Sequence, residues 1–281
     1  MCCSIQFTRW QTFCACARPA LQPFLASGKI DGIHNKLTAM TQNIYDDPAF
    51  FAGYSQLGRS VDGLAGAAEW PALQAMLPPL HGLKVVDLGC GYGWFSRWAR
   101  EQGAASVLGL DVSTKMLERA AQMTQDAAIT YARADLEQLD LPDAAFDLAY
   151  SSLTLHYIEN LPGLLQRVWQ ALAPGASLVF SIEHPIYMAS MQPGWVIEAN
   201  GRKTWAVDNY QVEGPRRTNW LAEGVIKQHR TIGTLLNLLI GAGFTITHVE
   251  DWGPTAAQVA ARPELTEERE RPMMLLVSAR R

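Results

Sequence analysis

The chain has 281 residues, a net charge of −4, and a content of 48% hydrophobic and 18% charged residues. This composition is typical of a globular protein, and the length suffices for one large α/β domain with an insertion. There is no long basic run, which argues against a nucleic-acid partner. The apolar stretches are shorter than the ~20 residues that a membrane-spanning helix needs, so we also expect no membrane partner.

Four of the five cysteines lie within the first sixteen residues, and Cys90 is the only thiol in the rest of the chain. The spacing of the four does not match the usual zinc patterns, so we predict no metal site. The lack of a disulfide framework is typical of a reducing compartment. The expected location is therefore the cytoplasm.

Residues 1–39 differ from the rest of the chain because they show no sustained hydrophobic period. They also lack the charged start and apolar core of a secretory signal. We predict a disordered tail over 1–39 and a single domain over 40–281, with Met40 as a candidate for the natural start. The alternative is a transit peptide, which Arg9 and Arg18 weakly favour.

Strand-like and helical segments alternate through the centre of the chain. Such alternation predicts βαβ units and a parallel sheet. Two segments depart from it: residues 45–80 have a helical pattern, and residues 185–228, rich in aromatic side chains, are predicted to form a β-rich insertion. Strands are predicted over 83–88, 106–110, 129–134, 146–151, 176–182, 244–250 and 273–279, and helices over about 93–102, 114–125, 161–172 and 232–240.

The first strand runs into a turn with glycines at alternate positions, Gly89, Gly91 and Gly93. Glycines permit unusual backbone angles and let a ligand approach the main chain. The helix that follows offers free N–H groups to a polar ligand. A dinucleotide-binding turn needs G-x-G-x-x-G, but Trp94 stands where its third glycine would be. Asp111 ends the second strand twenty residues after Gly91, the spacing that an acid needs to reach a ribose.

These motifs resemble those of the class I S-adenosylmethionine (SAM)-dependent methyltransferases, in particular the small-molecule branch named methyltransferase type 11. The resemblance covers roughly residues 45–281. It implies a Rossmann-like, seven-stranded, mostly parallel α/β sheet with an antiparallel last strand, an N-terminal helical lid and an inserted cap. The matching motifs are Asp87-Leu88-Gly89-Cys90-Gly91-Tyr92-Gly93, Gly109-Leu110-Asp111-Val112-Ser113 with Met116-Leu117, Ala134-Asp135-Leu136, Phe146-Asp147-Leu148-Ala149-Tyr150-Ser151 and Leu172-Ala173-Pro174-Gly175-Ala176.

The resemblance also implies how SAM would be bound. Asp111 would accept hydrogen bonds from the ribose hydroxyls, Asp135 would accept one from the adenine amino group, and Asp87 would order the glycine turn or reach the methionine amino group. Tyr54 and Arg59 of the lid would contact the methionine part. Asp111 and Asp135 each have the alternative of being a plain turn or cap residue. The remaining cofactor-binding candidates are Gly89, Cys90, Gly91, Gly93, Val112, Met116, Leu136, Ser151 and Ser152.

Three residues are candidates for the catalytic site, namely His156, Glu183 and His184. In similar methyltransferases the segment around His156 borders the transferable methyl group. Glu183 and His184 end the fifth strand, and parallel sheets bind ligands at the carboxyl ends of their strands. We predict His184 as a general base because histidine is the natural base near neutral pH. His229 is an alternative base, and each histidine has the further alternative of a packed structural side chain.

The predicted function is transfer of a methyl group from SAM to a small-molecule acceptor through an oxygen, nitrogen or carbon nucleophile, with S-adenosylhomocysteine (SAH) as product. The aromatic residues of the insertion suit a flat, partly apolar acceptor. We expect a monomer or a homodimer. Two alternatives remain open, a SAM-binding regulatory module without catalysis and an NAD-dependent oxidoreductase, and the glycine spacing argues against the second.

Overall fold

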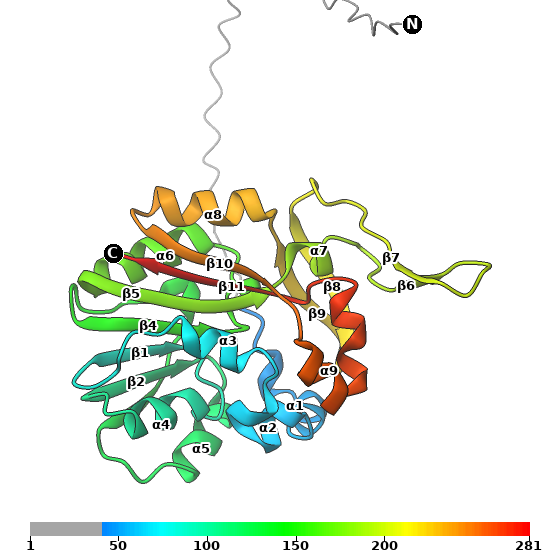
Figure 1. Cartoon of the computed structure of the whole chain (residues 1–281). Coiled ribbons are helices and arrows are strands. Elements are labelled where there is room, and N and C mark those ends of the chain that lie inside the picture. The colour runs from blue at the N-terminus through cyan, green and yellow to red at the C-terminus, as the bar shows by residue number, and fades with distance from the viewer. Residues whose placement is uncertain (1–40) are drawn as a thin grey trace, which may run out of the picture. The chain divides into compact units, whose positions relative to one another are not determined.

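The computed structural model describes residues 41–281 (Figure 1), so the expected tail over 1–39 lies outside the described residues. A seven-stranded sheet with the strand order β10-β11-β5-β4-β1-β2-β3 runs through the described part. Its strands are β1 (Lys84–Leu88), β2 (Ser106–Asp111), β3 (Ile129–Arg133), β4 (Phe146–Ser152), β5 (Leu172–Glu183), β10 (Thr245–Trp252) and β11 (Met274–Arg280).

Strand β11 runs antiparallel to both of its neighbours, β10 and β5, whereas the pairs from β5 across to β3 are all parallel. The prediction of a mostly parallel sheet with an antiparallel last strand is confirmed. Strand β5 starts earlier than the sequence indicates. Its register against β4 shifts between Leu172 and Ser177, because Pro174 and Gly175 form a local bulge there rather than a separate turn.

The helices match the predicted alternation, and their ends carry side-chain caps. Asn160, Ser113 and Thr231 each accept a hydrogen bond from a backbone N–H in the first turn of α6, α5 and α8, which satisfies one of the unpaired donors there. None of the helices in residues 41–281 is long and apolar enough to cross a membrane. The α-helices are α1 (Pro48–Tyr54), α2 (Gly58–Val61), α3 (Trp70–Ala75), α4 (Trp94–Glu101), α5 (Thr114–Gln122), α6 (Leu161–Ala171), α7 (Pro185–Met188), α8 (Ile232–Gly241) and α9 (Ala256–Ala261), and the 3₁₀ helices are η1 (Ile44–Asp46), η2 (Gly63–Gly66), η3 (Leu136–Gln138), η4 (Leu155–Tyr157) and η5 (Pro263–Arg269).

Helices cover both faces of the sheet, and each face has its own hydrophobic core. On one face α6 and α8, which lie side by side in Figure 1, bury Leu165 and Leu235 against the strands. On the other face α3 and α4 bury Trp70 and Phe95, and the Phe95 ring stacks on Tyr150 of β4 at 3.5 Å between centroids. Burial of both faces explains why these strands read as nearly continuous apolar runs.

The N-terminal segment over 44–75 is helical, as predicted, but it forms several short helices instead of long ones. Asp47 caps α1 by accepting a hydrogen bond from the Phe50 N–H at 2.8 Å. Gly63, the first residue of η2, has a positive φ of 61°, so the chain changes direction there after α2. The broken path lets this segment fold over the carboxyl ends of the strands and line the cavity described below.

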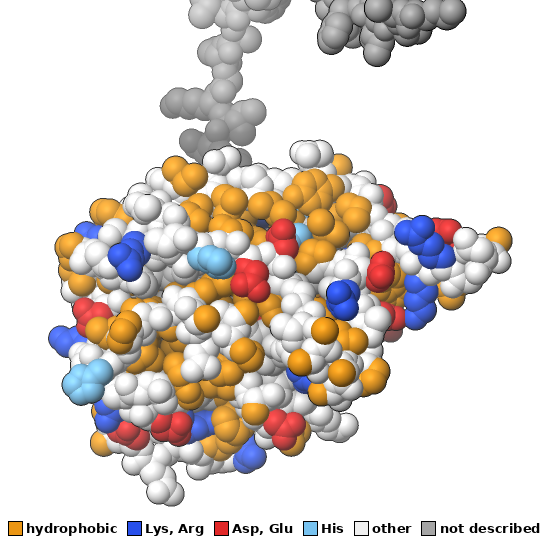
Figure 2. Space-filling model, in the orientation of Figure 1, with side chains coloured by type: hydrophobic (Ala, Val, Ile, Leu, Met, Phe, Trp, Pro, Cys, Tyr) orange, Lys and Arg blue, Asp and Glu red, His pale blue; other side chains and the backbone are white. Residues whose placement is uncertain are grey.

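The insertion between β5 and α8 contains α7 and two hairpins, β6 (Trp195–Ile197) with β7 (Lys203–Trp205) and β8 (Gly214–Trp220) with β9 (Ala222–His229). The β6–β7 hairpin projects from the sheet in Figure 1, and Figure 2 shows charged side chains gathered on it. The aromatic-rich segment is therefore an insertion that is mostly β-structured, as the sequence predicted.

The segment between β10 and β11 holds α9 and η5, where the sequence predicted no element. Arg271, which follows η5, packs among aromatic rings of the insertion. Its guanidinium carbon lies 4.6 Å from the centroid of the Tyr187 ring and 4.4 Å from that of Trp205. The C-terminal segment is thus linked to the insertion by cation–π contacts.

Candidate active site

The turn after β1 opens onto a cavity at the carboxyl ends of the strands. Gly89, Gly91 and Gly93 have positive φ angles of 78°, 52° and 69°, which residues with side chains rarely adopt. A Cβ atom on Gly91 would meet no atom within 4 Å, whereas one on Gly89 would lie 2.1 Å from Thr154 Oγ1 and one on Gly93 2.0 Å from the Tyr131 hydroxyl. Gly91 leaves room for a ligand, and the other two glycines make room for neighbouring side chains.

Asp111, at the end of β2, holds this turn in place. Its Oδ2 accepts a hydrogen bond from the Gly91 N–H and its Oδ1 accepts one from the Ser113 N–H, both at 2.9 Å. Burial raises the pKa of the Asp111 carboxyl to about 6. Each carboxylate oxygen has a second acceptor site, and Asp111 lines the cavity, so it can also accept a hydrogen bond from a ligand.

Asp87 lies on β1, directly before the turn. Its Oδ2 accepts a hydrogen bond from Ser96 Oγ at 2.7 Å. Burial, with a smaller contribution from the negative charge of Asp111, raises the pKa of the Asp87 carboxyl to about 7. A positively charged ligand group nearby would favour the ionised form.

A third acid, Asp135, follows β3 and lines the same cavity. Its Oδ1 accepts a hydrogen bond from the Glu137 N–H and so caps η3, while its Oδ2 accepts one from the Thr41 hydroxyl at 2.6 Å. Asp135 is therefore both a cap and a cavity-lining carboxylate. The apolar lining of the cavity beside these acids includes Val112, Met116 and Leu136.

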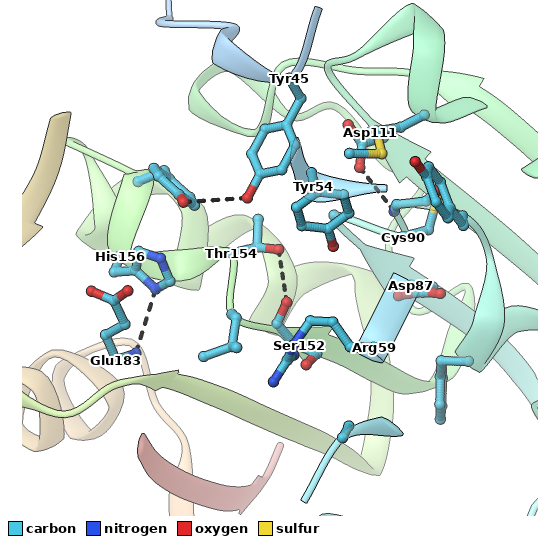
Figure 3. Close-up of a pocket in the computed structure, with 18 of the residues that line it drawn as sticks. Tyr45, Tyr54, Arg59, Asp87, Cys90, Asp111, Ser152, Thr154, His156 and Glu183 are labelled. Carbon is cyan, nitrogen blue, oxygen red and sulfur yellow. Dashed lines mark hydrogen bonds between the residues drawn. The ribbon is translucent and has the colours of Figure 1, made fainter. Parts of the chain in front are cut away.

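The N-terminal helices bring Tyr54 and Arg59 to the cavity, as Figure 3 shows. Arg59 Nη2 forms an ion pair with Glu69 Oε1 at 3.0 Å. The second oxygen of Glu69, Oε2, and the indole nitrogen of Trp94 are buried without a hydrogen-bond partner within residues 41–281. Both residues line the cavity. Because buried polar atoms are normally paired, these two atoms mark a place for polar groups of a ligand.

His156, Glu183 and Lys227 meet on the other side of the cavity, where Figure 3 shows the first two. His156 Nδ1 accepts a hydrogen bond from the Glu183 N–H at 3.4 Å. Glu183 Oε1 forms a buried ion pair with Lys227 Nζ at 2.5 Å. Burial, and secondarily the charge of Lys227, lowers the pKa of His156 well below its ordinary value, which favours the neutral imidazole.

Aromatic side chains separate these two sides. The hydroxyl oxygens of Tyr45 and Tyr157 lie 3.2 Å apart. Tyr54 and Trp220 meet edge to face with ring centroids 6.5 Å apart, and all four residues line the cavity. The interior between the acids and His156 is therefore mainly apolar, with polar groups at defined points.

The structure does not bring His184 into this cavity. Its ring is fully buried, with Nε2 2.8 Å from Asp251 Oδ1 and Nδ1 accepting a hydrogen bond from the Ile186 N–H. His184 thus caps α7, whose first residue is Pro185. The prediction of His184 as a general base conflicts with this placement, because both ring nitrogens already bond to the protein outside the cavity lining.

Three other candidates also lie outside the cavity lining. Ser151 is buried, and its Oγ donates a hydrogen bond to the Leu88 carbonyl at 2.8 Å. Gly93 packs closely against the Tyr131 side chain and leaves no room for a Cβ atom. His229 Nε2 bonds to the Tyr210 carbonyl at 2.9 Å. The predicted candidates that do line the cavity are Tyr54, Arg59, Asp87, Gly89, Cys90, Gly91, Asp111, Val112, Met116, Asp135, Leu136, Ser152, His156 and Glu183.

Sequence reasoning missed several lining residues, above all Lys227 and Glu69. Lys227 lies on the same face of β9 as the buried Val225 and His229, but its inward direction depends on the pairing with Glu183, which the sequence does not reveal. Glu69 stands directly before Trp70-Pro71 at a helix start, and that position carried no signal of a ligand site. Within residues 41–281, no group of three or more His, Cys, Asp or Glu side chains could hold a metal ion.

Comparisons with known proteins agree with this geometry. A family model described as a methyltransferase domain matches residues 86–180, from β1 into β5. A SAM-dependent methyltransferase from Mesorhizobium loti, known from its crystal structure, is 64% identical in sequence to this chain. The two structures match with a TM-score of 0.76 over 78% of this chain and 100% of that one. The chain belongs to the SAM-dependent methyltransferases. The predicted family, enzyme class and cofactor, SAM, are confirmed for this methyltransferase.

Other relatives of this methyltransferase extend the comparison. A putative SAM-dependent methyltransferase from Listeria monocytogenes is 38% identical, with a TM-score of 0.70 over 76% of this chain and 98% of that one. An uncharacterized protein of Haemophilus influenzae is 36% identical to this chain, and the matched region covers 85% of this chain and 97% of that protein. A malonyl-[acyl-carrier protein] O-methyltransferase of Pectobacterium atrosepticum is 30% identical over 63% of this chain and 70% of its own length.

Proposed function

We propose that this methyltransferase acts on a small-molecule acceptor and that one cavity holds SAM and the acceptor together. The observation that carries the proposal is the continuity of the cavity lining. In Figure 3, Asp87, Cys90 and Asp111 lie on one side and His156 and Glu183 on the other. Ligands of parallel sheets bind at the carboxyl ends of the strands, where this cavity opens.

One side of the cavity fits SAM by its donor and acceptor groups. Asp111 would accept hydrogen bonds from the ribose hydroxyls, and Asp135 would accept one from the adenine amino group. Arg59 would bind the methionine carboxylate, because guanidinium and carboxylate groups form strong charge-assisted hydrogen bonds. Asp87, or Glu69 through its unpaired Oε2, would accept from the methionine ammonium group.

When bound, SAM supplies a methyl group on a positively charged sulfur. The chain's own contribution would be alignment of the acceptor and exclusion of water. Tyr45, Tyr54 and Trp220 would exclude water with their rings, while His156 and Glu183 would present polar groups to the acceptor.

The names of two relatives support a small acceptor group. One is the malonyl-[acyl-carrier protein] O-methyltransferase of Pectobacterium atrosepticum. The other is a trans-aconitate 2-methyltransferase of Deinococcus radiodurans, 37% identical over 111 residues. Each named acceptor group is small, but the malonyl group is carried on a protein, so trans-aconitate is the name that supports a free small-molecule acceptor.

The assignment of Asp111 has a direct test by calorimetry with SAH. Charge-assisted hydrogen bonds contribute roughly 1.5–3 kcal/mol each, so Asp111→Ala should weaken SAH binding by at least about tenfold. Asp140→Ala is the matched control, because the Asp140 side chain is fully exposed. Unchanged SAH affinity in a folded Asp111→Ala protein would contradict the assignment.

The acceptor itself can be sought in a cell extract. Purified protein and methyl-labelled SAM should yield a labelled molecule in the small-molecule fraction. Label found only on macromolecules would contradict a small acceptor. Binding of SAH without any methyl transfer would instead favour a SAM-binding regulatory module.

A further inference from the structure

His156 presents a hydrogen-bond donor to the cavity. Its Nδ1 accepts a hydrogen bond from the Glu183 N–H, so Nδ1 carries no proton in this arrangement. A neutral imidazole has one N–H group, which must then be on Nε2. His156 lines the cavity (Figure 3), and within residues 41–281 no residue forms a hydrogen bond with its Nε2.

This tautomer makes His156 a poor base. An imidazole nitrogen that already carries a proton cannot accept another, and the free lone pair on Nδ1 is occupied by the Glu183 N–H. Burial and the neighbouring Lys227 charge also lower the pKa of His156, which disfavours the imidazolium that a base would become.

Lys227 presents further donors at the same place. Its ammonium group has three N–H donors, and its side chain is only 4% exposed. Within the described residues, Lys227 Nζ donates a single hydrogen bond, to Glu183 Oε1. The ring centroid of Trp220 lies 5.1 Å from Nζ. A buried ammonium is stable only when its donors are paired, so an oxygen acceptor in the cavity would complete its bonding.

We propose that the methyl acceptor is a carboxylate, held by the Nε2–H of His156 and the remaining N–H groups of Lys227, and that its methylation needs no general base. The inference rests on the proposed function and names the acceptor class for it. His156 and Lys227 both contact Glu183 and both line the cavity, and their donors suit a group that only accepts hydrogen bonds. An ionised carboxylate is such a group.

The reaction balances without a proton transfer. A carboxylate oxygen forms a bond to the methyl carbon while the carbon–sulfur bond breaks, and the electron pair of that bond goes to the sulfur. The products are a methyl ester and SAH. A hydroxyl acceptor would instead have to lose a proton, for which the second carboxylate oxygen of Glu183 would be the available base.

The chemical stability of the product separates these possibilities. The purified protein is incubated with methyl-labelled SAM and a small-molecule extract, and the product is treated with mild alkali. A methyl ester releases its label as volatile methanol, which is the expected result. Label that stays bound marks an ether, amine or carbon product and overturns the carboxylate, although methyl transfer stands. No transfer despite SAH binding contradicts the proposed function and this inference with it.

Variants at His156 test its role as a donor. His156→Gln keeps an N–H donor and should keep kcat/KM within about tenfold, whereas His156→Leu should lose about 10²-fold, consistent with a hydrogen bond to a charged group. Both should bind SAH as tightly as the wild type. His248→Gln is the matched control, since His248 is exposed on β10. Equal, large losses in the Gln and Leu variants would indicate a base and overturn the inference.

A spectroscopic measurement adds a readout that does not depend on turnover. The ¹⁵N shifts of histidine rings in the SAH-bound protein should include, besides rings such as His184 whose Nδ1 also accepts a hydrogen bond, a further ring with a proton on Nε2 and none on Nδ1 from about pH 6 to about pH 8. That signal should be missing from His156→Gln. A proton on Nδ1 of His156 would overturn the proposed arrangement.

Discussion

Asp87 is a buried acid that would be more stable as a neutral group. Its pKa rises from the ordinary 3.8 to about 7 on folding, mainly through burial. The folded state therefore holds its proton to higher pH than the unfolded chain. The stability that this proton contributes is present at acidic pH and is lost as the pH rises toward 7.

Asp87→Asn should remove this loss, because an amide does not ionise and its oxygen can still accept from Ser96. We expect the variant to exceed the wild type in free energy of unfolding by at most about 4 kcal/mol at pH 8, and by only about 1 kcal/mol at pH 4.5. Denaturant titrations without ligand measure both differences. Asp140→Asn, at an exposed site, should leave the pH profile unchanged, and parallel profiles for wild type and Asp87→Asn would contradict the prediction.

The sequence predicted several cavity residues at the carboxyl ends of central strands, but it did not predict Lys227 of the insertion. The positions of Asp87, Asp111 and Asp135 follow from the strand pattern, because each lies at or next to the carboxyl end of a parallel strand, whereas the resemblance to the family supplied their expected roles. The same argument failed for His184, since the Pro that follows it starts a helix and turns the imidazole into its cap. Lys227 was out of reach because its position depends on pairing with Glu183, 44 residues away.

The insertion contributes to the cavity through Tyr187 of α7 and through the β8–β9 hairpin, but not through the β6–β7 hairpin. Trp220 and Lys227 of β8–β9 line the cavity. Trp195 does not, although its aromatic character made it a candidate for contact with the acceptor. Its Nε1 donates to Glu267 Oε2 at 2.9 Å, on the side of η5.

A pair of tryptophan variants distinguishes the two hairpins. Trp220→Ala should raise the KM for the acceptor by about tenfold or more, because an aromatic ring buried against a ligand contributes roughly 1.5–3 kcal/mol. Trp195→Ala should leave the acceptor KM within about twofold. Steady-state kinetics at saturating SAM measures both. Equal effects of the two changes would mean that the insertion acts as one unit.

At the scale of the whole molecule, the short segment before η1 joins two distant parts of the cavity lining. The Thr41 hydroxyl donates to Asp135, and the Gln42 side chain bonds to the Gly224 carbonyl and the Ile226 N–H of the β8–β9 hairpin. Periodicity in the sequence could predict the sheet because βαβ units are local. These contacts span more than 90 residues each and depend on the finished fold.

Two shortened chains test this connection. A chain that begins at Met40 should bind SAH with unchanged affinity, in line with the proposed single domain over 40–281. A chain that begins at Asn43 lacks Thr41 and Gln42, and its SAH affinity should fall by at least about threefold, since a lost hydrogen bond typically costs ~1 kcal/mol. Calorimetry measures both. Equal affinities in the two chains would show that these two residues do not support the site.

The position of Arg271 among aromatic rings has an optical consequence. Its guanidinium carbon lies 4.4 Å from the Trp205 ring centroid and 5.4 Å from that of Trp195, and it also contacts Tyr187 of the cavity lining. Indole emission shifts with the electric field across the ring, so a displacement of the insertion relative to this cation changes the fluorescence of both tryptophans. The molecule therefore carries an intrinsic reporter, far along the chain from the glycine turn, whose fluorescence would change if an acceptor displaced the insertion.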